Sequence, residues 1–377
     1  MRFHWIRGIH LAVGLLLACD VPLERFARPD ASGEDGPIAA CERPSELCDG
    51  VCVNVVESST SCGTCGHDCG GGACAGGACQ PVVVASADQL DQPAALAVNA
   101  TAIFWTERTR VRSCPLASGC AQDPKLIADA YLKLNAIGVT DDAVYFTGCR
   151  TCFGQQDLRR CPVSGCPDPV PYVTTTTLGY EEIIVGRTRA YWRDGSEALL
   201  ECEHADCAGS DVRWPYSDFG GELLAAATDG STVYVKPVGT GFGSELRACT
   251  ETMGCGSKRL VTNSSRITAP FRVHDGSVFW LAAGPLTGLV KTCVLANCGD
   301  GTTFAEDDQG STEIEVDDTG VYWLSPSGAI RHCPLLGCPP DGPRTLVSGR
   351  SLPKELTLGA GFVYWIESNA IFKVAKP

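Results

Sequence analysis

Seven copies of a short apolar and aromatic pattern constrain the fold of this chain more than any other feature. Their central aromatic residues lie about 43 residues apart on average. A repeat of this length is typical of β-propellers, in which each repeat folds as one four-stranded blade. The copies are Ile103–Trp105, Val144–Phe146, Ala190–Trp192, Val233–Val235, Val278–Trp280, Val321–Trp323 and Val363–Trp365.

Each copy is flanked by further strand and turn signals. Alternating segments such as Ile137–Val139 and Phe271–Val273 come before it, followed by Asp141-Asp142 or Asp275-Gly276. Asp and Gly tolerate positive φ and favour tight hairpin turns. A third strand that usually ends in cysteine follows, and then a fourth, such as Thr345–Ser348. The pattern therefore predicts four short antiparallel strands in each repeat.

The two ends of the repeat region predict how the ring closes. The seventh repeat has a third strand, Ile371–Val374, but no fourth strand before Pro377. Val82–Ser86 lies ahead of the first repeat, and we expect it to supply the missing outer strand. Such closure leaves no strand edge open for aggregation. We predict an all-β, seven-bladed β-propeller over residues 81–377, closed by this N-terminal strand and preceded by a small disulfide-rich module.

The N-terminus carries the features of an export signal. Arg2 and Arg7 precede the apolar run Ile9–Ala18, which is too short to span a bilayer but fits a signal-peptide core. The segment Leu16-Leu17-Ala18-Cys19 resembles the bacterial lipobox, which implies cleavage before Cys19 and lipidation of its thiol. An ordinary signal peptide cut nearby is the alternative. We assign residues 1–18 to a lipoprotein signal peptide and residues 19–40 to a flexible, Pro- and Gly-rich tether.

The 23 cysteines are too many for a reducing compartment unless they bind metal. Without Cys19 they fall into two even groups, eight in residues 41–80 and fourteen after residue 110. In the second group we expect Cys149 and Cys152 to form a loop disulfide, although a CxxC sequence also permits a redox site. The other expected disulfides clip the third strand of a blade to its fourth strand. They are Cys114–Cys120, Cys161–Cys166, Cys202–Cys207, Cys249–Cys255, Cys293–Cys298 and Cys333–Cys338.

Residues 41–80 are too short to bury a sufficient apolar core, so we expect crosslinks to hold them. Eight cysteines allow 105 pairings, and the sequence does not choose among them. A zinc site is the alternative, since Cys62 and Cys65 have ligand spacing and His67 is near. The run from Cys48 to Cys69 resembles Stig1-like cysteine modules, which precede domains of secreted proteins of myxobacterial type.

The aromatic strands also resemble the YWTD repeats of low-density-lipoprotein-receptor propellers and other bacterial extracytoplasmic propellers. The resemblance covers residues 81–377 and implies the fold rather than a receptor function. Receptor propellers have six blades. The aspartate of their YWTD motif has a counterpart here only in Asp194, while Glu107 and Glu367 place a glutamate at the same position.

Charge and composition exclude some functions. The formal net charge of −14 argues against nucleic-acid binding, which depends on Lys and Arg at phosphates. No metalloprotease, nucleophile-elbow, phosphate-loop or EF-hand motif is present, so we predict no catalytic residues, metal or cofactor. The pairs Asp141-Asp142, Asp307-Asp308 and Asp317-Asp318 fit turns better than acid/base couples.

Five basic residues stand two positions before the first cysteine of an expected disulfide. They predict either a ring of side chains that contact anions, or side chains near the outer edge of the blades that cover apolar surface. These are Arg112, Arg159, Arg247, Lys291 and Arg331.

Three functions remain open. The first is a monomeric, non-enzymatic binding or scaffolding protein of the bacterial cell envelope, lipid-anchored, extracytoplasmic and directed at an unidentified protein or glycan. The second is an exported hydrolase or lyase acting on carbohydrate or peptide at the channel. The third is a surface adhesin that uses the disulfide module. Converging His, Glu or Arg side chains at one channel mouth would favour the enzyme, and a small or apolar lining would favour the scaffold.

Overall fold

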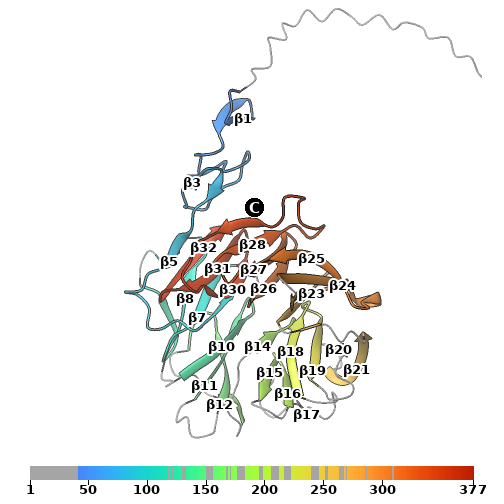
Figure 1. The fold of residues 1–377 in the computed structure, drawn as a ribbon. Coiled ribbons are helices and arrows are strands. Elements are labelled where there is room, and N and C mark those ends of the chain that lie inside the picture. Colours follow the sequence, from blue (N-terminus) through green and yellow to red (C-terminus); the bar gives the residue numbers. More distant parts are fainter. Residues whose placement is uncertain are drawn as a thin grey trace, which may run out of the picture. The chain divides into compact units, whose positions relative to one another are not determined.

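Seven four-stranded antiparallel sheets make up most of the described chain, one for each sequence repeat (Figure 1). The computed structural model describes residues 41–377 apart from short gaps. These gaps are 118, 121–122, 130–132, 150–155, 167–168, 170, 176–182, 195–197, 205–211, 216–221, 239–245, 251–253, 263–266, 269, 285–286 and 308–309. The fold is the predicted all-β, seven-bladed propeller.

The first four blades follow the chain in order from the inner to the outer strand. Blade 1 contains β6 (Ala95–Val98), β7 (Ala102–Thr106), β8 (Val111–Pro115) and β9 (Lys125–Ala128). Blade 2 contains β10 (Lys133–Val139), β11 (Ala143–Cys149), β12 (Gln156–Pro162) and β13 (Pro171–Thr175). Blade 3 contains β14 (Ile183–Val185), β15 (Arg189–Asp194), β16 (Ala198–Glu203) and β17 (Val212–Pro215). Blade 4 contains β18 (Glu222–Thr228), β19 (Thr232–Val238), β20 (Leu246–Thr250) and β21 (Gly254–Thr262).

The last three blades complete the ring. Blade 5 contains β22 (Phe271–His274), β23 (Ser277–Ala283), β24 (Gly288–Val294), the short 3-10 helix η2 (Leu295–Asn297) and β25 (Thr302–Asp307). Blade 6 contains β26 (Ile314–Asp317), β27 (Gly320–Leu324), β28 (Ile330–Cys333) and β29 (Arg344–Val347). Blade 7 contains β30 (Lys354–Gly359), β31 (Phe362–Glu367), β32 (Ala370–Ala375) and β5 (Val82–Ala85).

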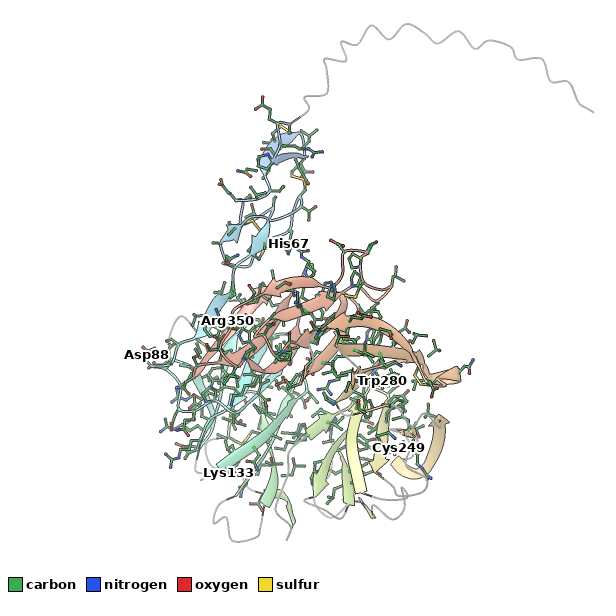
Figure 2. The ribbon with its side chains drawn as sticks, viewed as in Figure 1. His67, Asp88, Lys133, Cys249, Trp280 and Arg350 are labelled. Carbon is green, nitrogen blue, oxygen red and sulfur yellow. A yellow bond between two sulfur atoms is a disulfide. The ribbon has the colours of Figure 1, made fainter. Side chains whose placement is uncertain are left out.

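The second strand of each blade supplies most of the core. All five residues of β27 are buried, and Trp105, Trp280, Trp323 and Trp365 are fully enclosed (Figure 2 labels Trp280). A strand covered on both faces reads as a continuous apolar run, and aromatic and β-branched residues fill such a surface well. This burial explains why the repeat is recognisable as an apolar and aromatic triplet.

The inner strands form a complete circle. Each one packs beside the inner strand of the next blade, in the order β6, β10, β14, β18, β22, β26, β30 and back to β6. The predicted closure is confirmed, because β5 pairs with β32 through Ile371 opposite Ala85 and Lys373 opposite Val82. The last blade thus joins strands from both ends of the described chain.

The two kinds of predicted hairpin turn differ in backbone conformation. Asp275 and Gly276 both adopt positive φ, at 42° and 70°, as the Asp-Gly pair predicts. Asp141 and Asp142 do not have positive φ. Asp142 instead accepts a hydrogen bond of 2.6 Å from the Thr140 hydroxyl. The Asp-Asp turn is therefore held by its side chain, not by a left-handed backbone.

The cysteine-rich segment forms two small hairpins, β1 (Ser45–Cys48) with β2 (Val51–Asn54) and β3 (Cys74–Ala75) with β4 (Ala78–Cys79). Its disulfides are Cys41–Cys52, Cys48–Cys65, Cys62–Cys74 and Cys69–Cys79. Cys62, Cys69 and Cys79 lie in the same apolar cluster as Trp365 and Val374 of blade 7. Residues 41–377 accordingly form one compact unit.

Candidate functional site

The central channel contains a cavity of about 330 Å³ that every blade helps to line. Blades 1 to 3 contribute an apolar wall, which includes Leu96, Val98, Val139 and Ile184. Blades 5 to 7 contribute a polar wall of Arg272, Glu315 and Thr357. The two sides of the channel are therefore chemically different.

Arg272 and Glu315 join blade 5 to blade 6 across the polar wall. The Arg272 guanidinium donates to Glu315 Oε1 from Nη2 at 2.6 Å and from Nε at 2.9 Å. Nη1 donates to the carbonyl oxygen of Phe271 at 3.0 Å. All three guanidinium nitrogens of Arg272 are thus bonded to residues of the propeller, so this side chain joins blade 5 to blade 6.

Glu313 links blade 6 to blade 7 beside this pair. Its Oε1 accepts the backbone N–H of Glu355 at 3.0 Å, and its Oε2 accepts that of Leu356 at 2.6 Å. Burial raises the pKa of Glu313 despite these two hydrogen bonds. Both carboxylate oxygens support the bulge in β30, where Glu355 itself has a φ of 57°.

Glu355 continues the same chain of contacts to blade 1, where it accepts a hydrogen bond from the backbone of Leu96. Burial, followed by the nearby charge of Glu313, raises the pKa of Glu355 to about 7. Glu313 stands just before Ile314 and Glu355 just before Leu356, and both of these apolar residues are buried in the cores between neighbouring blades. Neither glutamate was predicted from the sequence, where their shared feature is a position directly before an apolar residue of an inner strand.

A second cavity, of about 440 Å³, lies beside the inner turns of blades 6 and 7. Asp317 accepts hydrogen bonds there from the Lys376 ammonium and from the backbone N–H of Thr319. Burial opposes the charge of Asp317, but these hydrogen bonds outweigh it and lower its pKa. His274 Nε2 lies 3.1 Å from the exposed carboxylate of Asp318. The Asp317-Asp318 pair thus forms a turn, and each carboxylate faces a basic group.

The predicted ring of basic residues is largely internal. Arg112 lies 3.3 Å from Glu107, Arg159 lies 2.5 Å from Asp157, and Arg331 lies 3.5 Å from Asp307. Arg159 is buried, and Arg112 and Arg331 are mostly covered. These three arginines therefore neutralise carboxylates of the blades.

Carboxylates of the blades also accept hydrogen bonds from buried tryptophans. Trp105 Nε1 donates to Glu107 at 3.0 Å, and Trp365 Nε1 donates to Glu367 at 3.2 Å. Asp307 of blade 5 does the same for blade 6, where it accepts a hydrogen bond of 2.5 Å from Trp323 Nε1. Glu107, Glu367 and Asp307 therefore have a structural role, and the expected Asp307-Asp308 turn includes Asp308, which lies outside the described residues.

Disulfides close the loops between third and fourth strands. The structure joins Cys114 to Cys120, Cys161 to Cys166, Cys293 to Cys298 and Cys333 to Cys338. Cys202 and Cys249 are also disulfide-bonded. The side chains of Cys149, Cys152, Cys207 and Cys255 lie outside the described part, as does Cys19.

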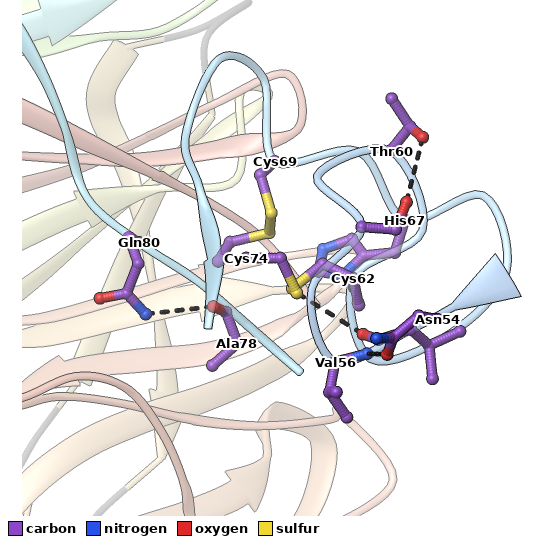
Figure 3. Close-up of a disulfide and its surroundings, with 12 residues drawn as sticks. Asn54, Val56, Thr60, Cys62, His67, Cys69, Cys74, Ala78 and Gln80 are labelled. Carbon is purple, nitrogen blue, oxygen red and sulfur yellow. Dashed lines mark hydrogen bonds between the residues drawn. A yellow bond between two sulfur atoms is a disulfide. The ribbon is translucent and has the colours of Figure 1, made fainter. Parts of the chain in front are cut away.

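The zinc alternative for the module is wrong, because Cys62 and Cys65 are each engaged in a disulfide and offer no thiolate. His67 has a different role. Figure 3 shows it among the disulfides of the module. Its Nδ1 lies 2.6 Å from the Cys62 carbonyl oxygen, and its Nε2 lies 2.7 Å from the carbonyl oxygen of Lys376, next to blade 7. The histidine thus joins the module to the last blade.

Comparison with known proteins shows the fold and no more. No protein-family model matches the chain, and no curated protein matches it. The chain is similar to the WD40 β-propeller domain of Doa1, with a TM-score of 0.53 and 9% identity over 75% of this chain and 92% of that one. A structure from an analysis of two prolyl endopeptidases gives a TM-score of 0.52 and 13% identity, over 77% of this chain and 50% of that one. The designed Ika8 protein gives a TM-score of 0.50 and 11% identity, over 76% of this chain and 83% of that one.

Among the described residues, no helix is long and apolar enough to cross a membrane.

Proposed function

We propose that this chain is a lipid-anchored, extracytoplasmic protein of the bacterial cell envelope whose propeller is a non-enzymatic binding or scaffolding domain. The many disulfides support an oxidising compartment, because thiols stay reduced in the cytosol. The Leu16-Leu17-Ala18-Cys19 segment supports lipidation at Cys19. Residues 19–40 then serve as the tether.

One observation carries the binding function. Arg272 and Glu315, the charged residues that line the described channel cavity, are bonded to each other, and Glu313 near them is bonded to two backbone amides. Such groups hold the blades in place, and a rigid scaffold that carries loops suits recognition. The disulfide-closed loops are the surface that we expect to meet a protein or glycan partner.

A crosslinked pull-down tests this function. The full-length lipoprotein is crosslinked in its native envelope, purified, and its partners are identified by mass spectrometry. We expect one stoichiometric partner that is retained when residues 41–80 are deleted, since the propeller carries the binding surface. Loss of the partner on that deletion would favour the adhesin function of the module, and no partner at all would contradict a scaffold for proteins.

The lipid anchor has its own test. Metabolic labelling with an alkyne fatty acid should label the wild-type chain and leave a Cys19→Ala chain unlabelled and released from membranes. Labelling that persists in the Cys19→Ala chain would contradict lipidation at this residue.

A second candidate, a hydrolase or lyase at the channel, is favoured by the raised pKa of Glu355 next to Glu313. A carboxyl group with a pKa of about 7 is suited to general acid catalysis. Replacing Glu355 with Gln would abolish turnover by such an enzyme while leaving the fold intact. Activity of the purified chain on envelope glycans or peptides that disappears in Glu355→Gln would establish this candidate and displace the first.

A further inference from the structure

A recess of about 360 Å³ lies between blade 7 and the disulfide-closed loop of blade 1. This volume is at the lower end of the range of ligand pockets, about 300–1,000 Å³. Its walls combine aliphatic side chains from three segments with two polar side chains of blade 7. The residues that the argument uses are Val82, Val84, Ile103, Leu116, Tyr364 and Lys373.

Tyr364 lines this recess with a hydroxyl that has no hydrogen-bond partner among the described residues. Tyr364 is only 1% exposed, and its hydroxyl makes no hydrogen bond with any described residue. Burial raises the pKa of Tyr364 to about 12, so the phenol stays neutral and able to donate. The hydroxyls at the same position of three other blades all have partners. Tyr145 bonds His204 at 2.8 Å, Tyr234 bonds Asp229 at 3.0 Å, and Tyr322 bonds Thr319 at 2.6 Å.

Lys373 brings a positively charged side chain to the same recess. It stands opposite Tyr364 in the pairing of β31 with β32, and its Nζ lies 4.2 Å from the ring centre of Phe362. Burial lowers the pKa of Lys373, while Asp68 of the module favours its charged form. The described residues include no carboxylate within ion-pair distance of Lys373. The recess is thus lined by two donors, one of them cationic, that have no acceptor among the described residues.

We propose that this recess binds a small amphipathic carboxylic acid. Its aliphatic body packs against Val82, Val84, Ile103 and Leu116, and its carboxylate accepts hydrogen bonds from Tyr364 and Lys373. One cation and one hydroxyl match a single carboxylate, whereas a phosphate group presents more acceptor oxygens and charge than these two donors satisfy. This site is separate from the channel and does not depend on the function proposed above.

Isothermal titration of the folded chain with sodium octanoate tests the site. We expect saturable binding of octanoate, and no measurable binding of acetate, which lacks the aliphatic body, or of octanol, which lacks the charge. Tyr364→Phe should weaken octanoate binding about fivefold and Lys373→Met about tenfold, since each removes one hydrogen bond and keeps the apolar stem. Tyr322→Phe is the matched control, because its hydroxyl occupies the same place in blade 6 but bonds Thr319, and it should bind octanoate like the wild type.

Equal binding of octanol and octanoate would overturn the proposal, as would octanoate binding that Tyr364→Phe and Lys373→Met leave unchanged. No octanoate binding would overturn it as well. Ala117→Trp, an exposed change in the blade 1 loop, gives a variant outside the core that should block the recess without disturbing the fold. Thermal unfolding of each variant verifies that it is folded before the titration.

Discussion

The two walls of the channel hold their blades together in different ways. Blades 1 to 3 meet through aliphatic residues such as Val98, Val139 and Ile184, and blades 5 to 7 meet through Arg272, Glu315 and Glu313. Strand β30 of the polar wall is bulged, as β10 of the apolar wall is, and only in β30 does Glu313 accept the amides of Glu355 and Leu356. The comparison shows that a buried carboxylate near a propeller channel can accept hydrogen bonds from backbone amides of the next blade.

The largest effect that we expect comes from removing the Glu313 carboxylate. Glu313→Ala leaves the backbone amides of Glu355 and Leu356 without acceptors, which should lower the free energy of unfolding by about 4 kcal/mol. Urea unfolding at pH 7 measures it. Thr312→Ala, at the exposed neighbouring residue, is the control and should change little. A loss of stability below about 1 kcal/mol for Glu313→Ala would show that Glu313 does not hold blade 7 to blade 6.

The second prediction concerns pH. The pKa of Glu355 is about 7 in the folded chain against 4.5 ordinarily, so its protonated form favours folding. That contribution is complete below about pH 4.5 and is lost as the pH rises through 7, reaching about 3 kcal/mol at most. Glu355→Gln keeps a neutral side chain, so its stability relative to the wild type should rise from pH 5 to pH 8. A stability difference that does not change over this range would contradict the raised pKa.

The third prediction adds a hydrogen-bond acceptor for a buried tryptophan of blade 5. Trp280 Nε1 in blade 5 has no hydrogen-bond partner among the described residues, and Ala282 occupies the place that Glu107 has relative to Trp105. Ala282→Glu should therefore raise the free energy of unfolding by about 1 kcal/mol. Ala283→Glu points to the other face of the strand and should not stabilise the chain. Equal effects of the two substitutions would indicate a general charge effect.

The smallest effect is expected at the Arg272–Glu315 pair. Both side chains are partly exposed, at 31% and 22%, so solvent screens their attraction. Arg272→Met should cost about 0.5–1 kcal/mol at low salt, and less in 1 M NaCl. A loss as large as that of Glu313→Ala would place the ion pair, and not the glutamate, at the centre of the polar wall.

Much of the fold was predictable because the aromatic triplets are buried on both faces, which preserves their pattern in every repeat. The closing strand could be inferred from the missing fourth strand of blade 7. The roles of Glu313 and Glu355 could not, because each depends on a neighbour from another blade. The arginines of the third strands were visible in the sequence, but their partners Glu107 and Asp307 come from different strands and could not be assigned.

The central claim is that the channel carboxylates hold the ring together and that the molecule acts as a binding platform. The most direct measurement is the envelope pull-down repeated with a Glu355→Gln chain, after circular dichroism has shown that this chain is folded. The account predicts that the same partner is recovered in the same amount as with the wild type. A folded Glu355→Gln chain that loses the partner, or that retains an uncleaved glycan or peptide, would contradict it.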